Sequence, residues 1–207
     1  MTDVKSESRK ERTAATRRRM LDSAYDLFCA DGFRATTMEA IARSAEVAVQ
    51  TLYFTFHTKD ELLQAVQDRA VLGDDPLPPP QQVWFAEMRD APALRDAVRI
   101  FADNLATILG RVAPLLPTFH AVAGDPAGVV WRRSEVLRRE GYTQIVEIWA
   151  TKAARHRAVS ARRGVDRLFV LAGPEVYRSL TDDCGWSRRH YVDWLVSTIM
   201  QQLYDGR

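Results

Sequence analysis

Apolar residues recur at intervals of three and four positions along most of this 207-residue chain, and this spacing lines one face of an α-helix. The series Leu21, Ala24, Leu27 and Phe28 is an example. No segment shows a convincing alternation of apolar and polar residues, which is typical of a strand. The sequence therefore predicts an all-α fold, with helices in its second half over residues 92–110, 114–123, 126–156, 160–172, 174–183 and 187–204.

The composition is that of an ordinary globular protein, with 46% hydrophobic and 27% charged residues. The net charge of +2 is only mildly basic, so any argument for DNA binding depends on where the charges lie. The two cysteines, Cys29 and Cys184, lack the spacing of a disulfide framework or a zinc site. No stretch approaches the roughly 20 apolar residues of a membrane span, and no apolar signal region follows the N-terminus. We therefore expect a cytoplasmic protein without a metal or cofactor.

Turn and capping signals divide the N-terminal region into short helices. Gly32 follows the first helical pattern and is the usual residue of a left-handed helix cap. Thr36 and Glu39 have the spacing of a capping box, which predicts a second helix of about two turns. After a break near residues 46–47, a third short helix is predicted over 48–54. The core of these helices and the next one is predicted to include Leu21, Phe28, Ile41, Leu52 and Leu62.

A longer helix follows and ends in a proline-rich run. Thr58 and Glu61 repeat the capping-box spacing and open a helix over 58–72. Residues 73–80 are rich in proline and cannot continue it, because proline lacks the backbone donor and displaces the preceding residue from helical geometry. This run marks a boundary or a rigid connection.

Two short helices joined by a tight turn match the helix-turn-helix motif, whose second helix enters the major groove of DNA. The small residues Ala48, Val49 and Thr51 would let the third helix approach DNA closely. Gln50 could bond the edge of adenine, and Val49 or Ala48 could touch a thymine methyl group. The remaining DNA-binding candidates, which carry hydroxyl, imidazole or ammonium groups suited to phosphates, are Thr36, Thr37, Tyr53, His57 and Lys59. The alternative for these residues is that they only cap helix ends or interact with solvent.

The chain is thus divided into three parts. Residues 1–15 are polar and carry charges of both signs, so they are predicted to form a flexible basic arm. Residues 16–57 form a three-helix DNA-binding domain, and residues 58–207 a larger helical domain, with helix 58–72 linking the two. Our hypothesis is that basic residues of the arm and first helix reach phosphates or the minor groove, the alternative being a solvated tail. These residues are Lys5, Arg9, Lys10, Arg12, Arg17, Arg18 and Arg19.

The segment 17–66 resembles the DNA-binding region of the tetracycline-repressor (TetR) family. The resembling residues are Gly32, Thr36, Thr37, Ile41, Ala42, Thr51, Leu52, Tyr53, Phe56 and Lys59. The sequence departs from the family pattern at Glu46, where the family commonly has Gly, and at Ala48, where it often has Ser. If position 46 is left-handed, a residue other than Gly costs about 1 kcal/mol there.

The resemblance implies a homodimer that represses transcription and is released by a small-molecule effector. By the same resemblance, helices 160–172 and 187–204 form a four-helix dimer interface. A single recognition helix touches too few base pairs to discriminate a site. A near-palindromic double-stranded operator is therefore expected, with half-sites about one helical turn (roughly 34 Å) apart.

Aromatic and polar residues of the second half are candidates for lining an effector pocket. They are Phe101, Leu105, Phe119, His120, Trp131, Ser134, Arg138, Tyr142 and Trp149. Aromatic residues at helical spacing also form plain core, so the alternative is a dimerisation or protein-interaction module without a ligand. The histidines lack metal or catalytic-triad spacing, so no enzyme is expected.

Overall fold

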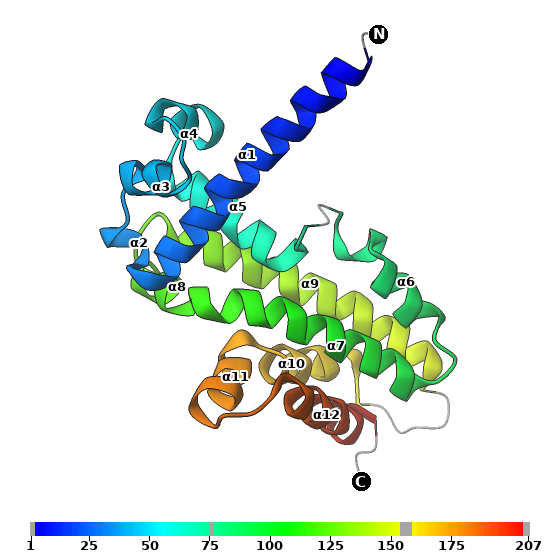
Figure 1. The fold of residues 1–207 in the computed structure, drawn as a ribbon. Coiled ribbons are helices and arrows are strands. Elements are labelled where there is room, and N and C mark those ends of the chain that lie inside the picture. Colours follow the sequence, from blue (N-terminus) through cyan, green and yellow to red (C-terminus); the bar gives the residue numbers. More distant parts are fainter. Residues whose placement is uncertain (1–2, 75–76, 154–158, 205–207) are drawn as a thin grey trace. The chain divides into compact units, whose positions relative to one another are not determined.

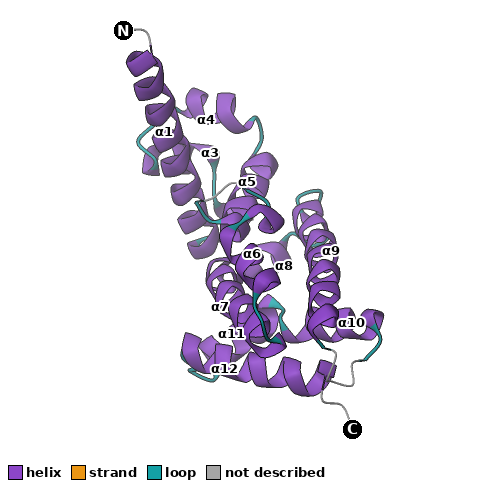
Figure 2. Cartoon of the chain, turned by 90° about the vertical axis from the view of Figure 1, so that its right-hand side faces the viewer, coloured by secondary structure: helices purple, strands orange, loops and turns teal. Residues whose placement is uncertain are grey.

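The computed structural model describes residues 3–74, 77–153 and 159–204. Every regular element in these ranges is helical (Figures 1 and 2), which confirms the all-α prediction. The chain divides into two compact units, the first made of Met1–Arg69 with Pro117–Trp131 and the second of Ala70–Leu116 with Arg132–Arg207. The division between Arg69 and Ala70 falls within helix 58–72, which the sequence predicted to link the two parts of the chain.

The first unit is built on the predicted helix-turn-helix. Its elements are α1 (Asp3–Ala30), α2 (Gly32–Ala35), α3 (Met38–Ser44), α4 (Val49–Phe56), most of α5 (Lys59–Leu72), α8 (Leu116–Ala121) and the start of α9 (Gly128–Lys152). All five residues assigned to its core from the sequence are buried. The segment 117–131 joins this unit through Thr118, whose buried hydroxyl donates to the Phe28 carbonyl at 2.6 Å.

Helix α1 is longer than the sequence pattern predicted. It begins at Asp3, so the predicted start near Thr16 and the non-helical arm over 1–15 are wrong for the described residues. The segment 3–15 contains neither Gly nor Pro and is rich in Glu, Lys, Arg and Ala, all of which favour a helix. Its polarity rules out a buried face but does not oppose helix formation. Within α1, Arg12, Arg17, Arg18 and Arg19 are exposed, and the side chains of residues 1–10 lie outside the described part of the structure.

The second unit is centred on α7 (Leu94–Val112), which packs against α6 (Val83–Asp90) and α12 (Arg188–Ile199). Leu94, Val98, Phe101, Leu105 and Leu109 form its buried stripe, at steps of three and four residues. The other elements are η1 (Pro79–Gln81), η2 (Ala113–Leu115), the rest of α9, α10 (Ala161–Leu171), α11 (Pro174–Arg178), and the π-helical turns η3 (Ser179–Asp183) and η4 (Met200–Tyr204). The helices predicted from residue 92 onward are therefore present with bounds shifted by a few residues, and the end predicted for 126–156 falls among residues that are not described.

The end of α5 is fixed by a side chain from α7. Gly73 has a positive φ of 76° directly after the helix, which is the usual way to end an α-helix. The Arg111 guanidinium donates to the carbonyls of Ala70 at 2.8 Å and Val71 at 3.4 Å. A cation that bonds the last carbonyls of a helix also offsets its dipole. Arg111 thus caps α5 where the proline-rich run begins.

Candidate functional site

The turn between α3 and α4 positions the predicted recognition helix. Helix α3 begins at Thr37, whose hydroxyl accepts a hydrogen bond from the Ala40 amide at 3.1 Å. Glu46 has φ of 55°, so the left-handed conformation considered from the sequence is present. The Val47 amide donates to the Ala42 carbonyl at 3.0 Å across this turn. Ala48 is the N-cap residue of α4, and its side chain makes no capping hydrogen bond.

Helix α4 has one buried and one exposed side. Leu52 and Phe56 are buried in the first unit. On the other side, Gln50 and Thr51 are exposed, as is Ala48 at the N-cap, and Val49 is half-buried. The predicted base-reading residues therefore share an accessible surface.

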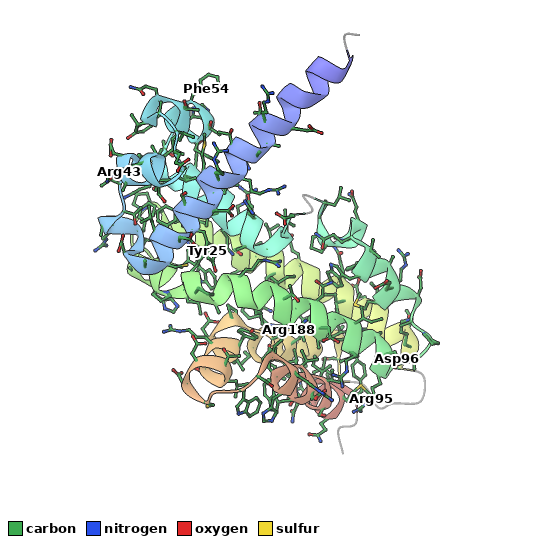
Figure 3. All side chains as sticks on the ribbon, in the orientation of Figure 1. Tyr25, Arg43, Phe54, Arg95, Asp96 and Arg188 are labelled. Atoms are coloured by element: carbon green, nitrogen blue, oxygen red, sulfur yellow. The ribbon has the colours of Figure 1, made fainter. Side chains whose placement is uncertain are left out.

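Two aromatic residues of α4 are also exposed. Tyr53, a predicted phosphate contact, is 44% exposed. Phe54 is 83% exposed and lies at the outer edge of α4 (Figure 3). Sequence reasoning missed Phe54. The helical spacing from buried Leu52 and Phe56 is the signal that could have identified it.

Thr36 is buried, which contradicts its prediction as a DNA contact. It is 2% exposed, and its hydroxyl donates to the Gly32 carbonyl at 2.8 Å, with the Leu27 carbonyl at 3.2 Å. The hydroxyl therefore stabilises the connection between α1, α2 and α3. Of the paired hydroxyls, only that of Thr37 is on the surface.

Lys59 also has a structural role that the sequence did not reveal. Its ammonium donates to the carbonyls of Phe33 at 2.8 Å and Thr36 at 2.9 Å, and lies 4.3 Å from the centre of the Phe33 ring. Burial lowers the pKa of the Lys59 ammonium, with the Asp60 charge opposing this shift. These bonds hold the start of α5 against the α2–α3 connection.

His57 follows the last residue of α4 with a positive φ of 50°, and it is exposed. Its amide donates to the Tyr53 carbonyl at 2.8 Å. The next residue, Thr58, accepts a hydrogen bond from the Glu61 amide at 3.1 Å, so the predicted cap of α5 is confirmed. His57 therefore lies at the junction of α4 and α5, with its imidazole on the surface.

Basic residues of α1 contact the helix-turn-helix. The Arg17 guanidinium lies 5.1 Å from the centre of the Phe56 ring, and the Arg19 Nε donates to the Ala45 carbonyl at 3.4 Å. Arg69 of α5 bonds Asp22 at 3.0 Å. Arg17 and Arg19 thus place positive charge close to α4 and to the turn that precedes it.

Four of the predicted pocket residues form a cluster in the second unit. Phe101 lies edge-on to Tyr142 and Trp149, with ring centres 5.8 and 5.1 Å apart, and Leu105 is buried in the same core. The Tyr142 hydroxyl donates to the Ala172 carbonyl at 2.8 Å, and burial raises its pKa to about 12. Tyr142 therefore remains a neutral donor at neutral pH.

The positive charge of Arg138 is balanced by a carboxylate inside the same unit. Its guanidinium pairs with Glu135 at 2.7 Å, donates to the Phe169 carbonyl at 2.8 Å and lies 3.7 Å from the centre of the Phe169 ring. Ser134 is half-buried one turn earlier on α9. The remaining predicted pocket residues belong to the first unit, where buried Phe119 stacks on Trp131 at 5.1 Å and His120 is exposed.

Two buried polar atoms in the second unit lack a hydrogen-bond partner among the described residues. They are Nε1 of Trp149 and the hydroxyl of Tyr191. Burial raises the pKa of Tyr191, so its hydroxyl keeps its proton. Leaving a buried donor unpaired costs about 1–3 kcal/mol. An acceptor that reached either atom would therefore bind favourably.

Residues 3–74, 77–153 and 159–204 contain no group of three or more His, Cys, Asp or Glu side chains placed to hold a metal ion. Across the same described part of the chain, no helix has the length and apolar character needed to cross a membrane.

Comparison with known proteins agrees with the helix-turn-helix geometry. Residues 20–66 match the family model of bacterial regulatory proteins of the tetR family. The regulator UidR of Escherichia coli K12 is 38% identical over 60 residues, which cover 27% of this chain and 31% of UidR. The chain is thus matched to about a third of the length of that relative.

Two further similarities extend over most of the chain. The transcriptional repressor KstR of Mycolicibacterium smegmatis is 29% identical over 185 residues, covering 78% of this chain and 87% of KstR. The structure of the fatty acid degradation regulator FadR from Bacillus halodurans superposes with a TM-score of 0.68 at 17% identity, covering 89% of this chain and 94% of FadR. The latter similarity concerns the fold alone. The match of residues 20–66 identifies the helix-turn-helix region as that of the tetR family of bacterial regulatory proteins, and the alignment with KstR extends the similarity over most of the chain.

Proposed function

We propose that this protein is a sequence-specific DNA-binding transcriptional regulator, acting as a repressor that a small-molecule effector releases from its operator. One observation carries the proposal. Helix α4 exposes Gln50 and Thr51 opposite its buried residues, at the end of a turn held by backbone hydrogen bonds. A helix presented in this way fits the major groove.

The proposed contacts divide by chemistry. Gln50 would bond the adenine edge in two places, and Ala48 or Val49 would contact a thymine methyl group. Thr37, Tyr53 and His57 would bond phosphates and set the register of the helix. Thr51 lies on the exposed side of α4 and would fit against the groove. Lys59 uses two of its three ammonium donors inside the unit, so only its third is left for a phosphate.

We further propose that the regulator is a cytoplasmic homodimer. Two recognition helices related by a twofold axis would read a near-palindromic operator, with half-sites about 34 Å apart. The alignment with KstR, a transcriptional repressor, over 78% of this chain supports a transcriptional regulator rather than a bare dimerisation module.

The effector would bind in the second unit, where the unpaired donors of Trp149 and Tyr191 lie in an apolar core. A ligand that prefers a conformation with wrongly spaced recognition helices would lower operator affinity. Its effect cannot exceed its differential affinity for the two conformations.

Selection of binding sites from a random DNA pool tests the proposal. We expect near-palindromic sites, a change of preference at one position per half-site for Gln50→Ala, and a uniform loss on all sequences for Tyr53→Phe. Val83→Ser, an exposed substitution in α6, is the control with unchanged binding. Equal losses on selected and random DNA for both α4 variants would count against base reading by this helix.

The N-terminal part of α1 is proposed to add phosphate contacts. Deleting residues 1–15 should flatten the dependence of operator affinity on salt, by about 0.9 in log–log slope for each phosphate that the protein no longer neutralises. Fluorescence anisotropy at several salt concentrations measures this slope. An unchanged slope would show that this segment does not touch DNA.

A further inference from the structure

Phe54 has a large apolar side chain that is almost fully exposed to solvent in the single chain. Such exposure is unfavourable unless a binding partner covers the ring. Its side chain is 83% exposed, more than that of any other large hydrophobic residue in the described part of the chain. Phe56, two residues later, is buried. The same residue type therefore has opposite environments within one turn of α4.

The position of Phe54 on α4 is set by helical geometry. Successive residues are about 100° apart around a helix, so Phe54 is separated by roughly 160° from both Leu52 and Phe56, which lie on either side of the opposite direction. It thus projects directly away from the core. Gln50, Thr51 and Phe54 are all exposed and form the outward face of α4, with Phe54 four residues after Gln50 and three after Thr51.

The outward face is the part of α4 that would approach base edges, and Phe54 can make no hydrogen bond there. The apolar feature that the major groove offers is the C5-methyl group of thymine, and phenylalanine is among the side chains that contact it. We infer that Phe54 contacts a thymine methyl group in each operator half-site and determines specificity at that base pair. This inference rests on the proposed function and adds a specificity-determining residue to it.

Replacing thymine by deoxyuridine removes only this methyl group and so tests the contact. Each thymine of the operator selected by the wild-type protein is replaced in turn, in both half-sites together, and the dissociation constant is measured. At the position that Phe54 contacts we expect affinity to fall about fourfold per half-site, the ratio corresponding to the burial of one methyl-sized group. The symmetric substitution should then weaken binding by roughly sixteenfold.

Variants of Phe54 assign the contact to this residue. Phe54→Ser should bind thymine and deoxyuridine operators equally at that position, whereas Phe54→Leu should retain a preference for thymine. Because Phe54 is exposed, the thermal unfolding of Phe54→Ser should match that of the wild type. The control is Val83→Ser, which removes another exposed apolar side chain, 73% exposed, and should behave as the wild-type protein does.

Three results would overturn the inference while leaving DNA binding intact. One is a flat deoxyuridine scan with the wild-type protein. Another is persistence of every such loss in Phe54→Ser, which would assign all the methyl contacts to Ala48 or Val49. The third is a sedimentation coefficient of Phe54→Ser that differs from that of the wild type, together with the same deoxyuridine scan as the wild type. This result would assign Phe54 to a contact between protein chains. Failure of the wild-type protein to select any DNA would instead overturn the proposed function together with this inference.

Discussion

At the scale of single residues, adjacent side chains of one type have different roles. Thr36 points inward and bonds the backbone of the first unit, whereas Thr37 caps α3 at the surface. Both fit the same sequence signal, because a hydroxyl before a helix can serve as either cap or internal bond. Burial decides between them, and burial depends on contacts with residues that are distant in the sequence.

Lys59→Met should destabilise the protein because it removes hydrogen bonds. The variant lacks the donor to the carbonyls of Phe33 and Thr36, and we expect the free energy of unfolding to fall by about 1–3 kcal/mol. Urea unfolding followed by circular dichroism measures this change. Arg34→Met is the matched control, because its ion pair with Asp125 is exposed and should contribute no more than about 1 kcal/mol. Equal, small losses for the two variants would contradict a structural role for Lys59.

At the scale of elements, helices with a regular apolar stripe or a capping signal were predicted, whereas α2 and α6 were not. Helix α7 carries its own signal in five buried residues. Helix α2 has four residues, and α6 is held by burial of Phe85 and Met88, so tertiary packing rather than local pattern determines them. The exposed side of α4 could be predicted because its buried residues have helical spacing, as those of α7 do. The burial of Thr36 and the place of 117–131 depend on long-range contacts and could not be predicted.

Glu46→Gly should stabilise the turn between α3 and α4. Glycine adopts a positive φ without the penalty of a side chain, so we expect a gain of up to about 1 kcal/mol in the free energy of unfolding. The matched control is Glu39→Gly, which removes the same charge from inside α3 and should cost about 1 kcal/mol. Thermal unfolding of both variants at equal salt gives the comparison. A loss of stability in Glu46→Gly would mean that the Glu46 side chain stabilises the turn.

Arg111→Met should loosen the end of α5. Without its bonds to Ala70 and Val71 the last carbonyls are uncapped, and amide hydrogen exchange in the final turn should accelerate. Arg95→Met, an exposed substitution on the same helix α7, should leave this exchange unchanged. Identical exchange in the two variants would show that Gly73 and the proline-rich run suffice to end α5.

At the scale of the whole molecule, the proposed dimer depends on α10 and α12. Val170 of α10 is 64% exposed in the single chain, as expected for a residue that a partner subunit covers. Val170→Glu should therefore raise the dimer dissociation constant by at least tenfold, and operator binding at low protein concentration should fall with it. Val83→Glu, at an exposed position outside the proposed interface, is the control. Analytical ultracentrifugation measures both, and an unchanged association for Val170→Glu would place the interface elsewhere.

The outward face of α4 has a consequence for how such a regulator could evolve. Gln50 and Phe54 are exposed, and no side-chain hydrogen bond of theirs occurs within the described residues. Substitutions there should leave folding almost unaffected, since exposed positions without structural contacts usually change stability by less than about 0.5 kcal/mol. With the proposed base contacts of these two residues, operator preference could change after gene duplication without loss of the folded state. Substitutions of Thr36 and Lys59, by contrast, should destabilise the fold, because both side chains form hydrogen bonds inside the first unit. The fold is therefore expected to change more slowly than the DNA sequence that it recognises.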